Sequence, residues 1–259
     1  MKSKKGESMK IIALSNQKGG VAKTTTTAAL ASGLSGRGFK VLAVDLDPQS
    51  NLGFSSGADL LNMTVTLYDV FKDTAKLTDI IQHLEDYDVI VGGLSLAGAD
   101  MDFTQTGREY LLKEALVSVS DKYDFCLLDC PPTLGILTVN ALTAADSVIV
   151  PITADAYAIQ GLSQLKQLVD RVRKYSNNKL KIEGLLITRC DMTNVTKALT
   201  DQIYQAAEKL DTKVFEQPIR NSVAVRESQV LRSNLFTEAP RANATKDYTA
   251  FIDELLKGE

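Results

Sequence analysis

Short apolar runs alternate along the chain with longer segments in which apolar residues recur at helical spacing. The apolar runs are continuous and do not alternate with polar residues, which is the pattern of strands covered on both faces of a sheet. We therefore expect strands at residues 10–15, 40–45, 88–92, 124–129, 147–152 and 182–188, and a weaker one at 213–215.

The segments between these runs carry the helical pattern. We expect helices at residues 24–36, 66–72, 107–119, 136–145, 158–175, 195–210, 222–231 and 241–257. This alternation predicts an α/β fold with a doubly wound, mainly parallel sheet and helices on both faces. No linker rich in proline, glycine or serine divides the chain, so we expect a single domain at residues 9–259 after a flexible tail at residues 1–8.

Composition narrows the class of protein. Of the 259 residues, 44% are hydrophobic and 24% are charged, which is typical of a globular chain. No apolar stretch approaches the ~18 residues of a membrane helix, and no apolar run follows the N-terminal lysines as in a signal peptide. The single His83 and the three cysteines Cys126, Cys130 and Cys190 lack the spacing of a zinc site or a disulfide framework. We expect a soluble, cytoplasmic protein.

Charge is distributed unevenly along the chain. The net charge of −3 argues against a dedicated nucleic-acid-binding protein. Residues 1–150, however, sum to −5, whereas residues 151–259 sum to +2. Any basic surface is therefore expected in the second half.

Phosphate-binding chemistry is indicated directly after the first predicted strand. Residues 15–25 read SNQKGGVAKTT and lead into a predicted helix, which is the arrangement of a phosphate-binding loop, or P-loop. In such a loop Lys23 reaches the β- and γ-phosphates, the Thr24 hydroxyl binds Mg2+, and Thr25 with nearby amides holds the α-phosphate. The residues expected to bind the nucleotide here are Lys18, Gly19, Gly20, Val21, Ala22, Lys23, Thr24 and Thr25.

This loop resembles the deviant Walker A motif KGGVGKTTT of the ParA/MinD group of ATPases. The resemblance implies a P-loop NTPase fold and a catalytic role for Lys18, which would cross a dimer interface to the phosphates of the partner subunit. Ala22 departs from the motif, because the group has glycine there. A methyl group beside the phosphates can obstruct the close backbone approach that glycine permits, although alanine is acceptable there if φ is negative.

Carboxylates follow two further predicted strands. Asp45 and Asp47 end the second strand in DLDPQSN, and Asp129 ends the fourth in DCPP. Open α/β sheets place ligand chemistry at these strand ends. Both segments resemble motifs of the same group of ATPases. The resemblance implies that Asp47 orients the hydrolytic water as a catalytic residue, that Asp129 binds Mg2+ through water, and that Asp45 positions the switch segment.

The choice between GTP and ATP follows from a motif that the chain lacks. A GTPase would carry N-K-x-D after a later strand, but the chain reads Thr188-Arg189-Cys190-Asp191 there. ATP with Mg2+ is therefore favoured, and Arg189 is included among the expected ATP-binding residues. An iron–sulfur ATPase is disfavoured, because Cys126 lies inside a strand and Cys130 inside the DCPP motif.

The resemblance extends over roughly residues 9–257. Residues 133–162 resemble the Soj/ParA stretch after the DCPP motif, and IRNSVAVRESQ at residues 219–229 resembles a segment near its C-terminus. We identify a ParA/Soj-type partitioning ATPase. The resemblance implies an ATP-bound homodimer that binds DNA without sequence preference, is nucleoid-associated, and hydrolyses ATP slowly until a ParB-like partner stimulates it. Arg220 and Arg226 are the candidate DNA contacts.

Two alternatives stay open. A MinD-like ATPase would bind a membrane through a C-terminal amphipathic helix. Residues 241–257 have an apolar stripe, but their polar face is mostly acidic, so we expect this helix to pack on its own domain and expect no membrane partner. The other alternative is a nonhydrolysing, nucleotide-gated adaptor, which Ala22 keeps open.

Overall fold

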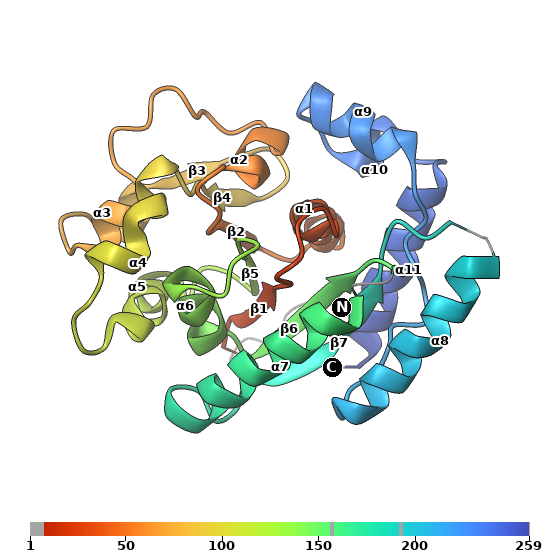
Figure 1. Cartoon of the computed structure of the whole chain (residues 1–259). Coiled ribbons are helices and arrows are strands. Elements are labelled where there is room, and N and C mark those ends of the chain that lie inside the picture. Colours follow the sequence, from red (N-terminus) through yellow and green to blue (C-terminus); the bar gives the residue numbers. More distant parts are fainter. Residues whose placement is uncertain (1–7, 156–157, 192–193, 259) are drawn as a thin grey trace.

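The computed structural model describes residues 8–155, 158–191 and 194–258, and its centre is a parallel sheet (Figure 1). Within these residues the sheet has seven strands in the order β3-β4-β2-β5-β1-β6-β7, and only β3 and β4 pair antiparallel. The strands are β1 (Lys10–Leu14), β2 (Val41–Asp45), β3 (Ile81–His83), β4 (Asp88–Ile90), β5 (Phe125–Asp129), β6 (Ser147–Ile152) and β7 (Lys181–Ile187).

Helices cover both faces of this sheet. The α-helices are α1 (Lys23–Ser35), α2 (Asn51–Ser55), α3 (Leu67–Phe71), α4 (Ala99–Asp102), α5 (Leu111–Leu116), α6 (Ile136–Ala144), α7 (Ala158–Tyr175), α8 (Asn194–Lys209), α9 (Val223–Leu231), α10 (Leu235–Glu238) and α11 (Asn243–Lys257). Short 3-10 helices are η1 (Leu77–Asp79), η2 (Leu94–Gly98), η3 (Arg108–Tyr110) and η4 (Val117–Val119). In Figure 1, α3, α4 and α5 lie towards the β3–β4 edge, and α7 and α8 towards β7.

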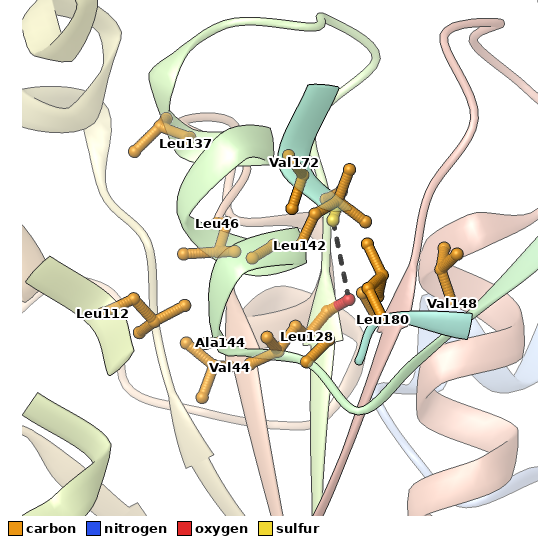
Figure 2. Packing of buried hydrophobic residues seen from close by; sticks show 14 of the residues in the cluster. Val44, Leu46, Leu112, Leu128, Leu137, Leu142, Ala144, Val148, Val172 and Leu180 are labelled. Carbon is orange, nitrogen blue, oxygen red and sulfur yellow. Dashed lines mark hydrogen bonds between the residues drawn. The ribbon is translucent and has the colours of Figure 1, made fainter. Parts of the chain in front are cut away.

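Two hydrophobic cores lie on opposite sides of the strands, because successive strand residues point to opposite faces. On one side, residues of α3 to α8 pack against the sheet, and Figure 2 shows Val44 of β2 and Leu128 of β5 among Leu137 and Leu142 of α6. On the other side, α1, α10 and α11 pack against Ile12, Ala43 and their neighbours. The predicted doubly wound fold is confirmed.

Differences from the sequence expectations are local. The segment at 213–215 contributes an isolated bridge, Leu185 to Val214, and no strand. Strand β3 was not predicted, and the helix expected at 107–119 is divided into η3, α5 and η4. Residues 1–7 of the expected flexible tail lie outside the described residues.

The register of the sheet brings the candidate carboxylates together. Asp45 is the partner of Asp129 across β2 and β5, and Leu14 is the partner of Asp129 across β1 and β5. The P-loop leaves β1 at this same edge. Three segments with expected chemistry therefore begin side by side at the carboxyl ends of adjacent strands.

Candidate functional site

The P-loop wraps the start of α1, and Lys23 is the first residue of that helix. Its side chain is largely buried, and Nζ donates a hydrogen bond to the Lys18 carbonyl oxygen at 3.2 Å. Burial lowers the pKa of Lys23, and the charge of Asp129 counteracts this. A largely buried ammonium that donates to a loop carbonyl, near the charge of Asp129, is poised to accept an anionic ligand.

Ala22 has φ +63°, in the left-handed region, so the condition under which alanine is acceptable at this position is not met. The turn into α1 needs this conformation, because the Ala22 carbonyl accepts from Thr26 N at 2.9 Å and so begins the helix. Glycine adopts a left-handed conformation without steric cost, whereas alanine does not. The departure from the family motif therefore strains the phosphate loop.

Asp129 is fully buried at the end of β5. Its Oδ1 accepts from Thr27 Oγ1 at 3.3 Å, while the buried Oδ2 has no hydrogen-bond partner among the described residues. Burial raises the pKa of Asp129 to about 7, and the hydroxyl of Thr24 and the ammonium of Lys23 counteract this rise. An unsatisfied carboxylate oxygen beside a threonine hydroxyl fits Mg2+, which usually keeps water ligands and takes one or two protein oxygens with substrate phosphates.

Asp45 holds the segment that carries Asp47. Its buried Oδ1 accepts from Asp47 N at 3.0 Å, and its Oδ2 accepts from Leu52 N at 2.9 Å and Gly53 N at 3.2 Å. Burial raises the pKa of Asp45, and the nearby Asp129 charge adds to the shift. Asp45 thus fixes both the backbone of Asp47 and the start of α2, which fits the positioning role expected for it.

Asp47 lies at the mouth of the site. Its Oδ1 accepts from Gln49 N at 3.0 Å, and the side chain lines the same cleft as Lys23 and Thr24. Asp47 therefore faces the same cleft as the start of α1.

Lys18 is engaged within its own subunit. Its ammonium forms an ion pair with Asp155 and donates to Thr153 Oγ1 at 3.3 Å. Both acceptors lie in the segment between β6 and α7. The side chain is still 37% exposed, so it lies at the surface rather than in the core.

A cleft of about 850 Å³ joins the P-loop to the segment after β7. Arg189 enters it from that segment and donates from Nη1 to the Gly20 carbonyl oxygen at 3.0 Å. Gln229 of α9, which sequence reasoning did not single out, donates from Nε2 to Thr25 Oγ1 at 3.0 Å. Its only sequence signal is its place within the matched segment at residues 219–229.

The two candidate DNA contacts differ in their surroundings. Arg220 is held by Asp247, with Nε donating to Oδ2 at 2.9 Å and Nη2 to Oδ1 at 2.6 Å. Asp247 is almost fully buried, so this pair fastens α11 to the segment that precedes α9. Arg226 is exposed on α9 and lines the cleft. The structure therefore separates an anchored arginine from an accessible one.

A glycine-rich loop between a strand and a helix, with a lysine and a threonine near strand-end carboxylates, defines a P-loop nucleoside triphosphate-binding protein. Residues 9–182 match the family model of the AAA domain. The chain belongs to the ParA/Soj family of P-loop ATPases. It is 42% identical to the sporulation initiation inhibitor protein Soj of Bacillus subtilis over 221 residues, covering 81% of this chain and 87% of Soj.

Other similar proteins match a larger share of this chain than Soj does. The chromosome partitioning protein ParA of Myxococcus xanthus is 35% identical over 252 residues, covering 96% of this chain and 88% of ParA. A Mycobacterium smegmatis structure described as cobyrinic acid a,c-diamide synthase with ADP and magnesium has a TM-score of 0.84 at 32% identity, over 96% of this chain and 94% of that one. The family and the fold expected from the sequence are confirmed.

The C-terminal helix packs as expected. Tyr248, Phe251, Ile252 and Leu255 of α11 are at most 1% exposed and belong to the core that contains α1. None of the helices in the described part of the chain is long and apolar enough to cross a membrane. The apolar stripe of α11 is therefore used inside the fold.

Proposed function

We propose that the protein is a DNA-partitioning ATPase that binds ATP with Mg2+, dimerises around the nucleotides, and binds DNA without sequence preference. Slow hydrolysis, stimulated by a ParB-like partner, then releases the DNA in a nucleoid-associated cycle. The observation that supports this best is the convergence of the P-loop, Asp47 and Asp129 in one cleft that also reaches Arg226 of α9.

The nucleotide is held by the start of α1. Lys23 and the amides of Gly19, Gly20 and Val21 bind the phosphates, and Thr24 with Asp129 holds Mg2+ directly and through water. When bound, the ion neutralises charge on the phosphate oxygens. The orphaned Asp129 Oδ2 supports this assignment, because an ordered metal water would satisfy it.

Hydrolysis is assigned to Asp47. Its Oδ1 is engaged by the Gln49 amide, so we assign Oδ2 to the water that attacks the γ-phosphate. Asp45 keeps Asp47 in place through the hydrogen bond to its amide. Phosphoryl transfer depends mainly on such positioning and on electrostatics.

Dimerisation is assigned to Lys18. In the subunit its ammonium is paired with Asp155, so reaching across to the partner's phosphates requires this pair to open. Exchange of one carboxylate for phosphate oxygens keeps the ammonium satisfied and couples assembly to bound ATP.

DNA binding is assigned to the surface of α9. Arg226 is the proposed phosphate contact, while Arg220 supports the surface through Asp247. Two subunits joined at the cleft would present this surface twice, which compensates for the modest basic charge of each.

The test is DNA retention by the purified protein with ATP, ADP or no nucleotide. We expect retention with ATP and Mg2+ alone. Equal retention under all three conditions would contradict a nucleotide-gated cycle, and absence of retention would contradict the DNA partner.

A second candidate is the nonhydrolysing adaptor, which the left-handed Ala22 favours. Strain beside the phosphates could leave binding intact while misplacing the γ-phosphate from Asp47. Measured ATP turnover above the uncatalysed rate would exclude it.

A further inference from the structure

Asn16 lies in the P-loop between β1 and Lys18 and is only 3% exposed. Its side-chain amide joins two backbone groups that are far apart in the sequence. Nδ2 donates to the Pro151 carbonyl oxygen of β6 at 2.8 Å, and Oδ1 accepts from Lys18 N at 3.0 Å. A carbonyl only accepts and a backbone amide only donates, so these two partners determine the orientation of the Asn16 amide. Asn16 therefore fastens the backbone of Lys18 to the end of β6.

The other polar groups of Lys18 also have partners. Its carbonyl oxygen accepts from Lys23 Nζ at 3.2 Å, and its ammonium contacts Thr153 and Asp155. Thr153 and Asp155 come shortly after Pro151 in the chain, so the backbone and the ammonium of Lys18 are tied to the same stretch. The contact of the ammonium with this stretch thus depends on where Asn16 places the Lys18 backbone.

Close packing surrounds the Asn16 amide. A Cβ atom on Gly161 of α7 would lie 3.4 Å from Asn16 Oδ1, so the amide is enclosed by the P-loop, β6 and α7. Loss of this side chain would remove a hydrogen bond from the Pro151 carbonyl and from the Lys18 amide, and buried polar groups are costly to leave without partners. The Asn16 side chain therefore restricts the position of the Lys18 backbone.

We propose that Asn16 is a positioning residue for Lys18. By joining the P-loop to the end of β6, it fixes the point from which the Lys18 ammonium reaches either Asp155 or the phosphates of a partner subunit. Asn16 and Asp155 then act in opposite directions on assembly. Asp155 competes with the partner subunit for the ammonium, whereas Asn16 preorganises the lysine where both can be reached. The effect on assembly rests on the proposed function, whereas the placement of Lys18 in its own subunit does not.

The placement is tested without nucleotide, by the rate at which acetic anhydride acylates Lys18, read by mass spectrometry of the digested protein. The amine reacts as the free base, so the rate reports how often the ion pair with Asp155 opens. Asn16→Ala should raise the Lys18 rate by about fivefold or more, because one hydrogen bond contributes about that factor to the held position. Lys166 is the reference in the same sample, since its ammonium is similarly exposed and also paired with an aspartate. Its rate should not change.

Asn140→Ala is the matched control variant. Asn140 is fully buried on α6, and its amide also joins two backbone groups: Oδ1 accepts from Leu112 N at 3.0 Å, and Nδ2 donates to the Arg108 carbonyl oxygen at 2.8 Å. Its loss removes the same kind of contact away from the P-loop. Asn140→Ala should therefore lower stability and leave the acylation rate of Lys18 unchanged.

Unchanged acylation of Lys18 in Asn16→Ala, or an equal rise in Asn140→Ala, would overturn the positioning role. Asn16→Asp is the second variant if Asn16→Ala does not fold. It keeps the shape of the side chain, but an ionised carboxylate cannot donate to the Pro151 carbonyl, so the tie to β6 is lost. Lys18 acylation should rise in this variant as well, and a wild-type rate would equally overturn the proposal.

Assembly separates the role of Asn16 from that of Asp155. With saturating ATP and Mg2+, light scattering across a dilution series should place the dimer midpoint of Asn16→Ala about tenfold or more above that of the wild type, because both subunits then present a less well placed lysine. Asn140→Ala should keep the wild-type midpoint. Asp155→Asn should lower it, although this variant also speeds acylation. A midpoint of Asn16→Ala at or below the wild-type value would overturn the positioning role. A wild type that forms no dimer with ATP would contradict the proposed function, and acylation would still decide the placement of Lys18.

Discussion

Ala22 combines a strained, left-handed backbone conformation with a position in the phosphate-binding loop. We expect Ala22→Gly to raise stability by about 0.5 kcal/mol, because relief of the left-handed strain exceeds the added entropy of the unfolded chain. Thermal unfolding should shift upwards by about 1–2 °C. Ala28→Gly, in the interior of the same helix, is the control and should lower stability by about 1 kcal/mol. Equal losses in the two variants would show that position 22 carries no strain.

The ion pair between Lys18 and Asp155 should restrain dimerisation. Asp155→Asn removes the charge that holds the lysine in its own subunit, so the ATP-dependent dimer should form at about two- to fivefold lower protein concentration, as expected for a partly exposed pair. Light scattering across a dilution series measures this. Asp170→Asn breaks the comparable exposed pair with Lys166 on α7 and should leave the midpoint unchanged. A higher midpoint for Asp155→Asn would contradict the restraint.

At the scale of elements, α9 is held by both apolar and polar contacts. Only Ser228 of this helix is buried, and Ala224 and Val225 pack partly buried against the core. In addition, Gln229 donates to Thr25, and Arg232 donates from Nε to the Phe54 carbonyl oxygen at 3.0 Å. The helix proposed to meet DNA is thus tied to the P-loop at one residue and to the end of α2 at another.

Gln229→Ala should loosen this tie. Amide hydrogen exchange in α9 should become faster, because the loss of one partly buried hydrogen bond lowers the free energy of local opening by about 1 kcal/mol. ATP should also lose its effect on DNA affinity. Gln202→Ala, an exposed glutamine on α8, should change neither quantity. Unaltered exchange in the Gln229 variant would show that α9 is held by other contacts.

The elements also show which features a sequence can predict. Continuous apolar runs predicted the long parallel strands, because burial on both faces leaves that pattern. Strand β3 has three residues and no periodicity, and it exists through its antiparallel pairing with β4. Helix α2 starts where Asp45, several residues earlier in the chain, accepts from its backbone amides. Such short elements depend on tertiary contacts that local pattern does not record.

The candidate site shows the same division. The P-loop and both strand-end carboxylates were predicted, since their chemistry is contained in short motifs. The pairing of Arg220 with Asp247 joins residues far apart in sequence, and the left-handed φ of Ala22 is a property of the folded turn. Neither is encoded in local spacing.

At the scale of the whole molecule, a substitution at Asp47 should leave ATP and DNA binding intact and block the release of DNA. Asp47→Ala removes the water-positioning carboxylate and leaves Lys23, Thr24 and Asp129 in place, so hydrolysis should slow by about 100-fold or more while ATP still binds. Dimers should then stay on DNA for as long as ATP is present. Release after ATP removal from a DNA-coated surface measures this, with Asp59→Ala, an exposed loop carboxylate, as the control. Wild-type release rates in the variant would place the switch elsewhere.

The proposed DNA surface predicts a dependence on salt. Arg226→Glu should weaken binding equally for unrelated DNA sequences and lower the salt slope by about 1 for each lost phosphate contact, with ATP-dependent dimerisation intact. Lys179→Glu, an exposed lysine just before the amino end of β7, makes the same charge change and should leave DNA binding unaltered, because the segment that leads into α9 pairs with residues beyond the carboxyl end of β7. Equal effects of the two substitutions would indicate that only net charge matters.

The packing of α11 on α1 has a consequence for biogenesis. Tyr248 Oη lies 3.2 Å from Thr26 Oγ1, and Phe251 and Ile252 complete the core beneath the helix that begins at the P-loop. A ribosome synthesises that loop more than two hundred residues before the helix that supports it. A nascent chain therefore cannot complete its nucleotide site until α11 has left the exit tunnel, which delays ATP binding, and any assembly that depends on it, until that point of translation.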